Sequence, residues 1–146
     1  MFENQVVWIT GASSGIGEAL ALQFATAGAR LVLSARRETE LERVRRLCAE
    51  RGLAPDQLLV LPLDVTDYPA MPGALASVLQ RFGRIDMLVN NAGISQRSRC
   101  VDTDMEVYRR LLEVNVFGQI ALTKQVLPRM IEQKSGVIIN ISSTAS

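Results

Sequence analysis

Five short apolar runs, separated by segments of helical periodicity, constrain the fold of this chain more than any other feature. Each run is built mainly from Val, Ile and Leu without polar alternation, which indicates strands buried on both faces. The predicted strands cover residues 6–9, 31–33, 58–63, 85–89 and 137–141. Strands that alternate with helices form a parallel sheet through right-handed crossovers. The pattern therefore predicts an α/β fold with helices on both faces of a doubly wound parallel sheet.

The four segments between these runs carry apolar residues at helical spacing and predict helices. We expect the helices to begin near Ile16, Thr39, Thr66 and Asp104. Thr39 and Glu42 have the S/T-x-x-E spacing of a capping box at the start of the second helix. The last helix is long, with Gly118 and Pro128 as positions where it would kink. With no repeat or low-complexity linker, residues 1–146 are predicted to form one Rossmann-like domain.

The sequence of 146 residues contains no His, which excludes several classes of chemistry. Ser-His-Asp and Cys-His hydrolases, His-ligated zinc sites and His general bases all require that side chain. We expect no metal site. The net charge of +1 gives no general attraction to nucleic acid or to an anionic membrane. Arg43, Arg45, Arg46 and Arg51 are interleaved with glutamates, so we interpret them as a solvated helix face.

Cysteine usage and hydropathy indicate the cellular environment. Cys48 and Cys100 are too few and too far apart for a disulfide framework, so both are expected as reduced thiols. No apolar run approaches the roughly 20 residues of a membrane span. No basic region precedes an apolar leader at the N-terminus. We therefore expect a cytoplasmic protein without membrane association.

A glycine-rich turn, TGASSGIG at residues 10–17, joins the first predicted strand to the first helix. Its glycines allow a sharp turn, close approach of a pyrophosphate to the backbone and close packing of the helix on the sheet. The helix N-terminus then offers free N–H groups and a positive dipole end to phosphate. An ordinary glycine-rich turn is the alternative. The candidate cofactor-binding residues here are Gly11, Ser13, Ser14, Gly15, Ile16 and Gly17.

The end of the second predicted strand indicates which dinucleotide would bind. An NAD site usually places an acidic residue there to hold the ribose 2′-OH. This chain has Arg36 and Arg37 instead, with no carboxylate before Glu38. A guanidinium can hold a 2′-phosphate through charge-assisted hydrogen bonds. The sequence therefore predicts NADP(H) rather than NAD(H), although the two arginines would also suit a solvent-facing helix start.

These motifs, together with four later ones, resemble the short-chain dehydrogenase/reductase family. The later motifs are Leu63-Asp64-Val65, Asn90-Asn91-Ala92-Gly93, Asn115 within EVNV, and Asn140-Ile141-Ser142-Ser143. All of them occur in the family's order. Ala35-Arg36-Arg37 resembles the NADP-using branch that acts on steroids, retinoids and other bulky carbonyl compounds. The resemblance implies hydride transfer between NADP(H) and a small-molecule alcohol or carbonyl substrate.

The same resemblance implies cofactor contacts from two of the later motifs. Asp64 would hydrogen-bond the adenine amino group, and Val65 would lie beside the adenine ring. Asn91, Ala92 and Gly93 would line the ribose and nicotinamide side of the cofactor. Both motifs follow predicted strands, so they would lie at the carboxyl edge of the sheet.

Two further matches imply catalytic roles, and a third implies a structural one. Ser143 matches the family's substrate-orienting Ser, and Asn115 matches the Asn that holds a water of the proton relay at a helix kink. Asn90 would tie neighbouring strands together. From the residues alone, Asn115 also suits a solvent-facing helix position, and Ser143 also suits a strand-end turn.

The family's Tyr-x-x-x-Lys is missing from this sequence. It would follow Ser143, but the sequence ends at Ser146, and neither Tyr68 nor Tyr108 is followed by Lys at that spacing. Without it, no proton source is positioned at the reacting oxygen. We therefore expect an NAD(P)-binding Rossmann domain that is incomplete at its C-terminus, truncated after the fifth strand and inactive by itself.

Two alternative functions stay open at this point. One is a dinucleotide-binding module without turnover, and the other is a Rossmann-like transferase that uses a different adenosyl cofactor. The transferase would favour a carboxylate at the end of the second strand, where this chain has arginines. The long helix from about Asp104 resembles the one through which family members pair, so a homodimer or homotetramer is expected.

Overall fold

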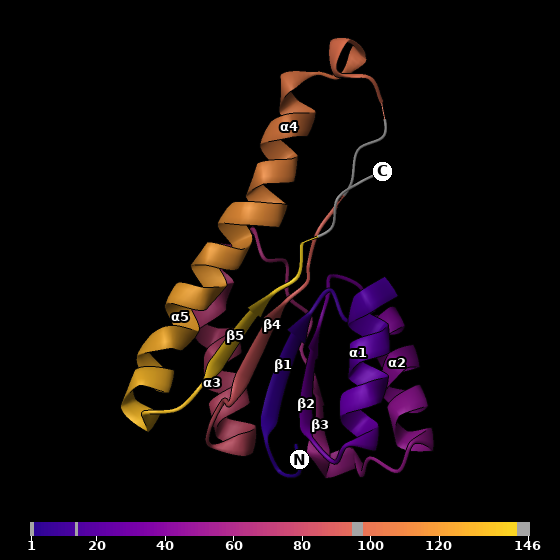
Figure 1. The fold of residues 1–146 in the computed structure, drawn as a ribbon, viewed down its shortest axis with the longest axis vertical. Helices are drawn as coiled ribbons and strands as arrows, with labels where there is room; N and C mark the ends of the chain where they lie inside the picture. Colours follow the sequence, from indigo (N-terminus) through magenta and orange to yellow (C-terminus); the bar gives the residue numbers. More distant parts are fainter. Residues whose placement is uncertain (1, 14, 95–97, 143–146) are drawn as a thin grey trace.

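The computed structural model describes residues 2–13, 15–94 and 98–142, which form a five-stranded parallel sheet with helices on both faces (Figure 1). The strand order is β3-β2-β1-β4-β5, and every neighbouring pair is parallel. The strands are β1 (Val6–Thr10), β2 (Arg30–Ser34), β3 (Leu58–Val60), β4 (Met87–Asn90) and β5 (Val137–Asn140). The predicted α/β class and doubly wound topology are confirmed.

The helices divide between the two faces of the sheet. One face is covered by the first two helices, and the other by α3 and α5, while α4 extends the line of α5 beyond the strand ends (Figure 1). The helices are α1 (Gly15–Thr26), α2 (Glu38–Glu50), α3 (Met71–Phe82), α4 (Met105–Leu112) and α5 (Gly118–Gln133). Within the described residues, no helix is both long enough and apolar enough to cross a membrane.

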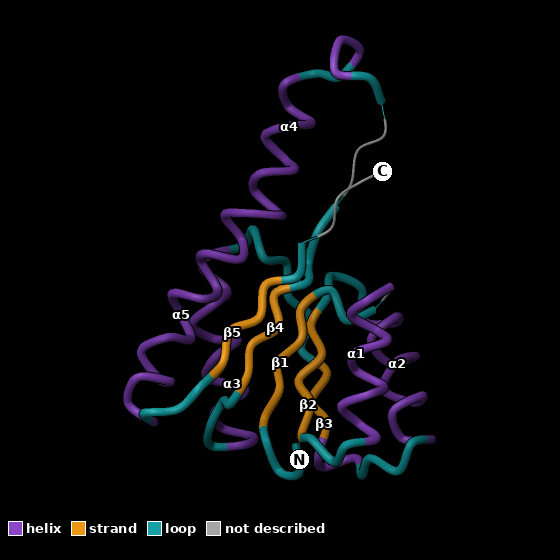
Figure 2. The backbone as a smooth tube through the Cα atoms, in the orientation of Figure 1, coloured by secondary structure: helices purple, strands orange, loops and turns teal. Residues whose placement is uncertain are grey.

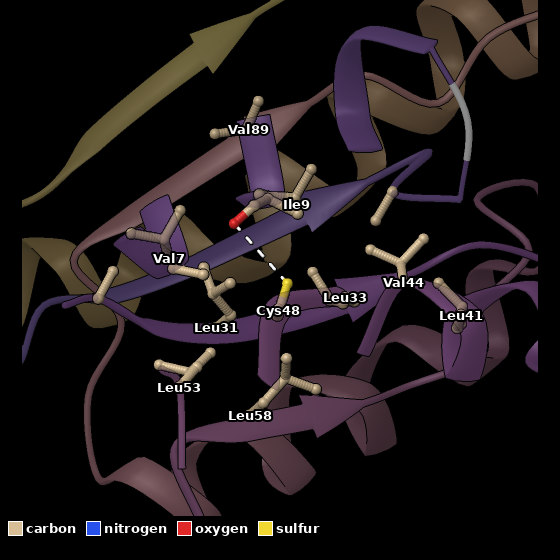
Figure 3. Close-up of a cluster of buried hydrophobic side chains, with 14 of the residues drawn as sticks. Val7, Ile9, Leu31, Leu33, Leu41, Val44, Cys48, Leu53, Leu58 and Val89 are labelled. Atoms are coloured by element: carbon tan, nitrogen blue, oxygen red, sulfur yellow. Dashed lines mark hydrogen bonds between the residues drawn. The ribbon is translucent and has the colours of Figure 1, made fainter. Parts of the chain in front are cut away.

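Two apolar cores form because successive side chains of a strand point to opposite faces. In β1, Val7 and Ile9 pack toward α1 and α2, whereas Val6 and Trp8 pack toward α3 and α5. All four side chains are fully buried, as expected for a central strand of a parallel sheet. Figure 3 shows the first of these cores, with Cys48 of α2 among the strand side chains.

The expected start of the second helix and the expected end of the third strand are wrong, each for a local reason. The helix α2 begins at Glu38 with Arg37 at its N-cap, so Thr39 lies within the first turn and caps nothing. Regular pairing of β3 ends at Val60 because Pro62 follows and has no N–H to donate. The Leu63 N–H still donates to the Ala35 carbonyl oxygen at 3.0 Å, so the chain continues beside β2.

The long helix is interrupted where Asn115 lies. A π-helical segment, Glu113–Phe117, separates α4 from α5, and it ends next to Gly118. The helix then continues through Pro128 to Gln133, so the second expected kink position does not end it. Single-turn π segments inside helices often mark functional sites because they displace side chains from the regular helical register.

The buried thiol of Cys48 generates a prediction about pH and stability. The sulfur lies 3.8 Å from the Ala21 carbonyl oxygen, and burial raises the pKa of this thiol to about 11 (Figure 3). The unfolded chain ionises at a lower pH, so the stabilisation from the neutral thiol is complete below pH 9 and is lost as the pH rises to 11. Between pH 8 and pH 11, the free energy of unfolding should fall by about 2 kcal/mol more in the native chain than in Cys48→Ala.

Urea unfolding at the two pH values measures this difference directly. Other groups that titrate in the same range are common to both proteins and cancel in the comparison. Equal losses in the native chain and in Cys48→Ala would contradict the prediction.

Candidate functional site

Two adjoining hollows lie along the carboxyl edge of the sheet, where the loops after β1, β4 and β5 leave the strands on the same side (Figure 2). Open α/β sheets bind ligands at this edge, where the strand order reverses. Here the reversal lies at β1, between β2 and β4. The first hollow has a volume of about 340 Å³ and the second about 470 Å³. Ala92, Gly93 and Ile94 line both hollows, so the two share a wall.

Most of the residues expected to bind a cofactor line these hollows. Those of the first hollow are Gly11, Ser13, Arg36, Arg37, Asp64, Val65, Ala92 and Gly93. Those of the second are Ile16, Asn91, Ala92 and Gly93, and Asn115, expected as a catalytic residue, also lines it. The fold therefore brings together candidate site residues from five separate parts of the sequence.

The hydroxyl of Thr10 connects the two turns that form the shared wall. Its oxygen accepts hydrogen bonds from the backbone N–H groups of Asn91 at 2.9 Å and Ala92 at 3.0 Å. The Asn91 side-chain amide donates in turn to the Gly11 carbonyl oxygen at 3.1 Å. Thr10 was missing from the expected site residues because its contribution depends on β4 lying beside β1. Its side chain is buried, so these bonds fix the turn after β1 against the turn after β4.

Gly17 lies beneath the glycine-rich turn and allows α1 to approach the sheet. A Cβ atom at this position would lie 2.1 Å from the Gly11 carbonyl oxygen and 2.6 Å from the Asn91 amide nitrogen. Gly11 itself has a φ of +60°, a conformation that other residues adopt only with strain. By contrast, no heavy atom lies within 4 Å of the Cβ position of Gly15, so that side of the turn is open.

The first hollow carries charges of both signs. Arg36 and Arg37 reach it from the end of β2, and Arg110 reaches it from α4. Two carboxylates, those of Glu40 and Asp64, line the same hollow. Neither Glu40 nor Arg110 was expected in the site, because each lies on a helix that only the tertiary fold places over the strand ends.

The Asp64 carboxylate is held in its ionised form. Partial burial acts to raise its pKa, but hydrogen bonds from Thr66 and the positive charges of Arg110 and Arg36 lower the pKa overall. One oxygen, Oδ1, accepts from both the Thr66 N–H at 2.9 Å and the Thr66 hydroxyl at 2.7 Å. These bonds fix the orientation of the carboxylate toward the first hollow.

Asn115 clamps the loop that follows β4. Its Oδ1 accepts from the Ile94 N–H and its Nδ2 donates to the Ile94 carbonyl oxygen, both at 2.8 Å. Because Asn115 lies in the π-helical segment, the clamp places the helix irregularity against the second hollow. Gln119, one turn further along, also lines that hollow. The interpretation of Asn115 as a solvent-facing helix residue is therefore wrong.

Asn90 ties β4 to its surroundings, as the family resemblance implies. Its side chain is buried, and its Nδ2 donates to the Thr123 hydroxyl at 3.0 Å and to the Asn140 carboxamide oxygen at 2.9 Å. The strand pair β4–β5 and the helix α5 are thereby held at one point. Asn140 lines the second hollow, so this structural contact borders the site.

Arg43 was interpreted as part of a solvated helix face, and the structure corrects this. Its guanidinium donates to the Ser13 carbonyl oxygen at 3.0 Å and to the Glu18 carboxylate at 2.7 Å. It therefore joins α2 to the glycine-rich turn and to α1. The other two arginines of this helix have no such contact with the site. Arg45 pairs with Glu42 on the same helix, and Arg46 is exposed.

Several expected features lie elsewhere. Ser14 and Ser143 fall outside the residues that the structure describes. Both tyrosines are described, and neither lines a hollow; Tyr68 donates to the Glu113 carboxylate at 2.5 Å. Over the described ranges, no group of three or more His, Cys, Asp or Glu side chains is arranged to hold a metal ion.

Comparison with known proteins identifies related chains. The family model described as short chain dehydrogenase matches residues 5–146. The chain is 58% identical over 141 residues to dehydrogenase/reductase SDR family member 7 of Homo sapiens, covering 96% of this chain and 42% of that protein. It is 46% identical over 143 residues to dehydrogenase/reductase SDR family member 7B of Bos taurus, covering 96% and 44%. The chain thus spans less than half the length of these curated relatives.

Solved structures show the same arrangement. A metagenomic short-chain oxidoreductase in complex with NADP matches with a TM-score of 0.89 and 35% identity, covering 99% of this chain and 64% of the other. NAD+-bound xylitol dehydrogenase matches with a TM-score of 0.91 and 34% identity, covering 97% and 54%. The structural relatives therefore include complexes with each of the two nicotinamide dinucleotides.

The packing at Gly17 generates a prediction that separates close approach from helix propensity. In Gly17→Ala, the new methyl group must displace backbone atoms of the glycine-rich turn, so the free energy of unfolding should fall by about 2 to 3 kcal/mol. Gly73 of α3 is the control, because a Cβ there meets no heavy atom within 4 Å. Gly73→Ala should stabilise the chain by roughly 0.5–1 kcal/mol.

Urea unfolding of the two variants and the native chain provides the measurement. Loss of stability in Gly73→Ala similar to that in Gly17→Ala would show that the close contact at Gly17 is not the cause.

Proposed function

Because the chain belongs to the short-chain dehydrogenase family, we propose that its first hollow binds the adenosine half of NADP(H). The full-length protein would use that cofactor to interconvert an alcohol and an aldehyde or ketone. The observation that carries the proposal is the pair Arg36 and Arg37 at the end of β2, lining the hollow. In an NAD site, a carboxylate that holds the ribose 2′-OH would be expected at this point.

The glycine-rich turn suits the cofactor's pyrophosphate. The open side of Gly15 leaves room for a ligand beside the backbone, and α1 starts at that residue. The first N–H groups of a helix have no partner within the helix and favour an anion. The residues present therefore fit a pyrophosphate, with Ser13 at the border of the same hollow.

The adenine end of the hollow combines one polar group with apolar walls. Thr66 occupies Oδ1 of Asp64, which supports a role for the second carboxylate oxygen as an acceptor for the adenine amino group. Val65 and Val114 are buried side chains that line the hollow and suit the faces of a flat ring. This combination supports adenine in preference to a charged group.

The second hollow suits the reacting end of the cofactor and the substrate. When bound there, the nicotinamide ring would supply or accept the hydride. From the family resemblance and from its place on the lining of this hollow, we infer that Asn115 orders a water of the proton relay, while its side chain fixes the loop at Ile94. Ser143 would orient the substrate oxygen, as the family resemblance implies.

A dinucleotide-binding module without turnover is the second candidate function. One observation favours it: of the two tyrosines in the described chain, neither lines either hollow. The described residues would then supply no phenol for proton transfer to or from the substrate oxygen. The two candidates differ in turnover and agree in nucleotide binding.

The first prediction of this proposal concerns the 2′-phosphate. Arg36→Ala should weaken NADP+ binding about thirtyfold, which corresponds to losing a charge-assisted contact of about 2 kcal/mol. NAD+ binding should change less than threefold, because NAD+ has no 2′-phosphate. Isothermal titration calorimetry with both nucleotides measures the ratio.

Arg46→Ala is the matched control. Arg46 is an exposed residue of the same helix, α2, and lines neither hollow, so the substitution removes a positive charge away from the site. It should leave both affinities within twofold. If Arg36→Ala weakens the binding of NADP+ and of NAD+ equally, the assignment of Arg36 to the 2′-phosphate is wrong.

The second prediction concerns turnover. Carbonyl-dependent oxidation of NADPH should be absent in the 146-residue chain and present in a chain extended to the length of its relatives. Absorbance at the NADPH band measures both. Turnover by the shorter chain would overturn the requirement for a Tyr and Lys beyond it, and binding without turnover in the longer chain would favour the binding module.

A further inference from the structure

Arg43 connects three parts of the chain at the border of the first hollow. Its Nη2 donates to the Glu18 carboxylate at 2.7 Å and to the Ser13 carbonyl oxygen at 3.0 Å, and its Nε donates to the Glu40 carboxylate at 3.3 Å. These partners come from α1, the glycine-rich turn and α2. The guanidinium is therefore shared between one site residue's backbone and two carboxylates.

Glu40 makes this arrangement important for a phosphate ligand. Its side chain lines the same hollow as Arg36 and Arg37. A carboxylate near a bound 2′-phosphate would repel it, because two negative charges in a partly desolvated site interact unfavourably over several ångströms. A hollow that accepts the phosphate therefore needs a positive charge that offsets Glu40 and limits its approach.

We propose that Arg43 is a positioning residue for a 2′-phosphorylated adenine nucleotide. It acts through Glu40, whose charge it partly offsets and whose carboxylate it holds toward α2, and through Ser13, whose carbonyl oxygen it holds toward α2. The inference rests on the proposed function, because it assigns selectivity within the same hollow. The ligand class is an adenosine carrying both a 5′- and a 2′-phosphate.

The contact with Ser13 acts on phosphates in a second way. A carbonyl oxygen carries a partial negative charge and would oppose a phosphate that it faced. The hydrogen bond from Arg43 keeps this oxygen directed toward the guanidinium and away from a bound phosphate. The turn can then present N–H groups to the ligand. This should also strengthen binding of the 5′-phosphate, though by less than the partial offset of the Glu40 charge strengthens binding of the 2′-phosphate.

Arg45 provides a matched control on the same helix. It forms an i,i+3 ion pair with Glu42 at 2.6 Å, comparable to the pair of Arg43 with Glu40, and both arginine side chains are 39% exposed. Neither Arg45 nor Glu42 lines either hollow. Arg45→Ala therefore removes an equal charge and an equal type of helix pair without touching the site.

The experiment compares adenosine 2′,5′-bisphosphate with adenosine 5′-monophosphate, because neither contains the nicotinamide half. Calorimetry on the native chain, Arg43→Ala and Arg45→Ala gives an affinity for each nucleotide. Arg43→Ala should weaken binding of the bisphosphate about tenfold and binding of the monophosphate about twofold. Only the bisphosphate has a 2′-phosphate, which the Glu40 carboxylate repels once Arg43 no longer offsets its charge. Arg45→Ala should change both by less than twofold.

Removing the Glu40 charge tests how Arg43 acts. Glu40→Gln alone should change bisphosphate binding by less than twofold, because Arg43 already offsets that charge. In the double variant with Arg43→Ala, it should restore most of the lost bisphosphate affinity and little of the lost monophosphate affinity. A purely structural role of Arg43 would show no such selective rescue.

Thermal unfolding without nucleotide checks that each variant folds, and Arg43→Lys replaces Arg43→Ala if the latter does not. Lys keeps the positive charge but cannot bind all three partners. The affinity for the bisphosphate should therefore fall less with Lys than with Ala, and Glu40→Gln should still restore it. Equal weakening of both nucleotides, or no rescue by Glu40→Gln, would overturn the inference alone. A native chain that binds neither nucleotide would overturn the proposed function and the inference with it.

Discussion

The hydrogen bonds of one buried hydroxyl group hold the candidate site together. Thr10 ends β1 at the point where the strand order reverses, and its oxygen accepts from the backbone of Asn91 and Ala92 after β4. Asn91 returns a bond to Gly11. The glycine-rich turn and the turn after β4 are therefore fixed relative to each other before any ligand arrives, so the shared wall of the two hollows costs little ordering entropy on binding.

Under the proposed function, charge as well as shape would distinguish the first hollow from a general nucleotide site. Arg36, Arg37 and Arg110 line it together with Glu40 and Asp64, so attraction and repulsion of phosphate depend on which carboxylates are already partnered. Asp64 is held by Thr66, and Glu40 by Arg43. Under the proposed function, the arginines at the end of β2 would hold the additional phosphate, while Thr66 fixes the direction of the Asp64 carboxylate and Arg43 partly offsets the charge of Glu40.

The sequence predicted the elements whose cause is local and missed the contacts whose cause is tertiary. The five strands follow from apolar runs, and the site at their carboxyl ends follows from glycine-rich and Arg-rich segments directly after two of them. The family resemblance implied a helix kink at Asn115, but the residues alone did not predict its π-helical form or the bonds of Asn115 to Ile94 across a loop. Arg43 was misread for a related reason: its pairing with Glu40 looks like a surface helix pair until the fold brings Ser13 beside it.

The two hollows also differ in the strands that border them. The first draws on the ends of β1 and β2, and each of these strands is paired on both sides. The second borders β5, which is paired with β4 alone and has no fully buried residue. Under the proposed function, affinity and turnover are separable: substitutions around Arg43 alter how a phosphate is held, while the position of Asn115 is fixed independently through Ile94.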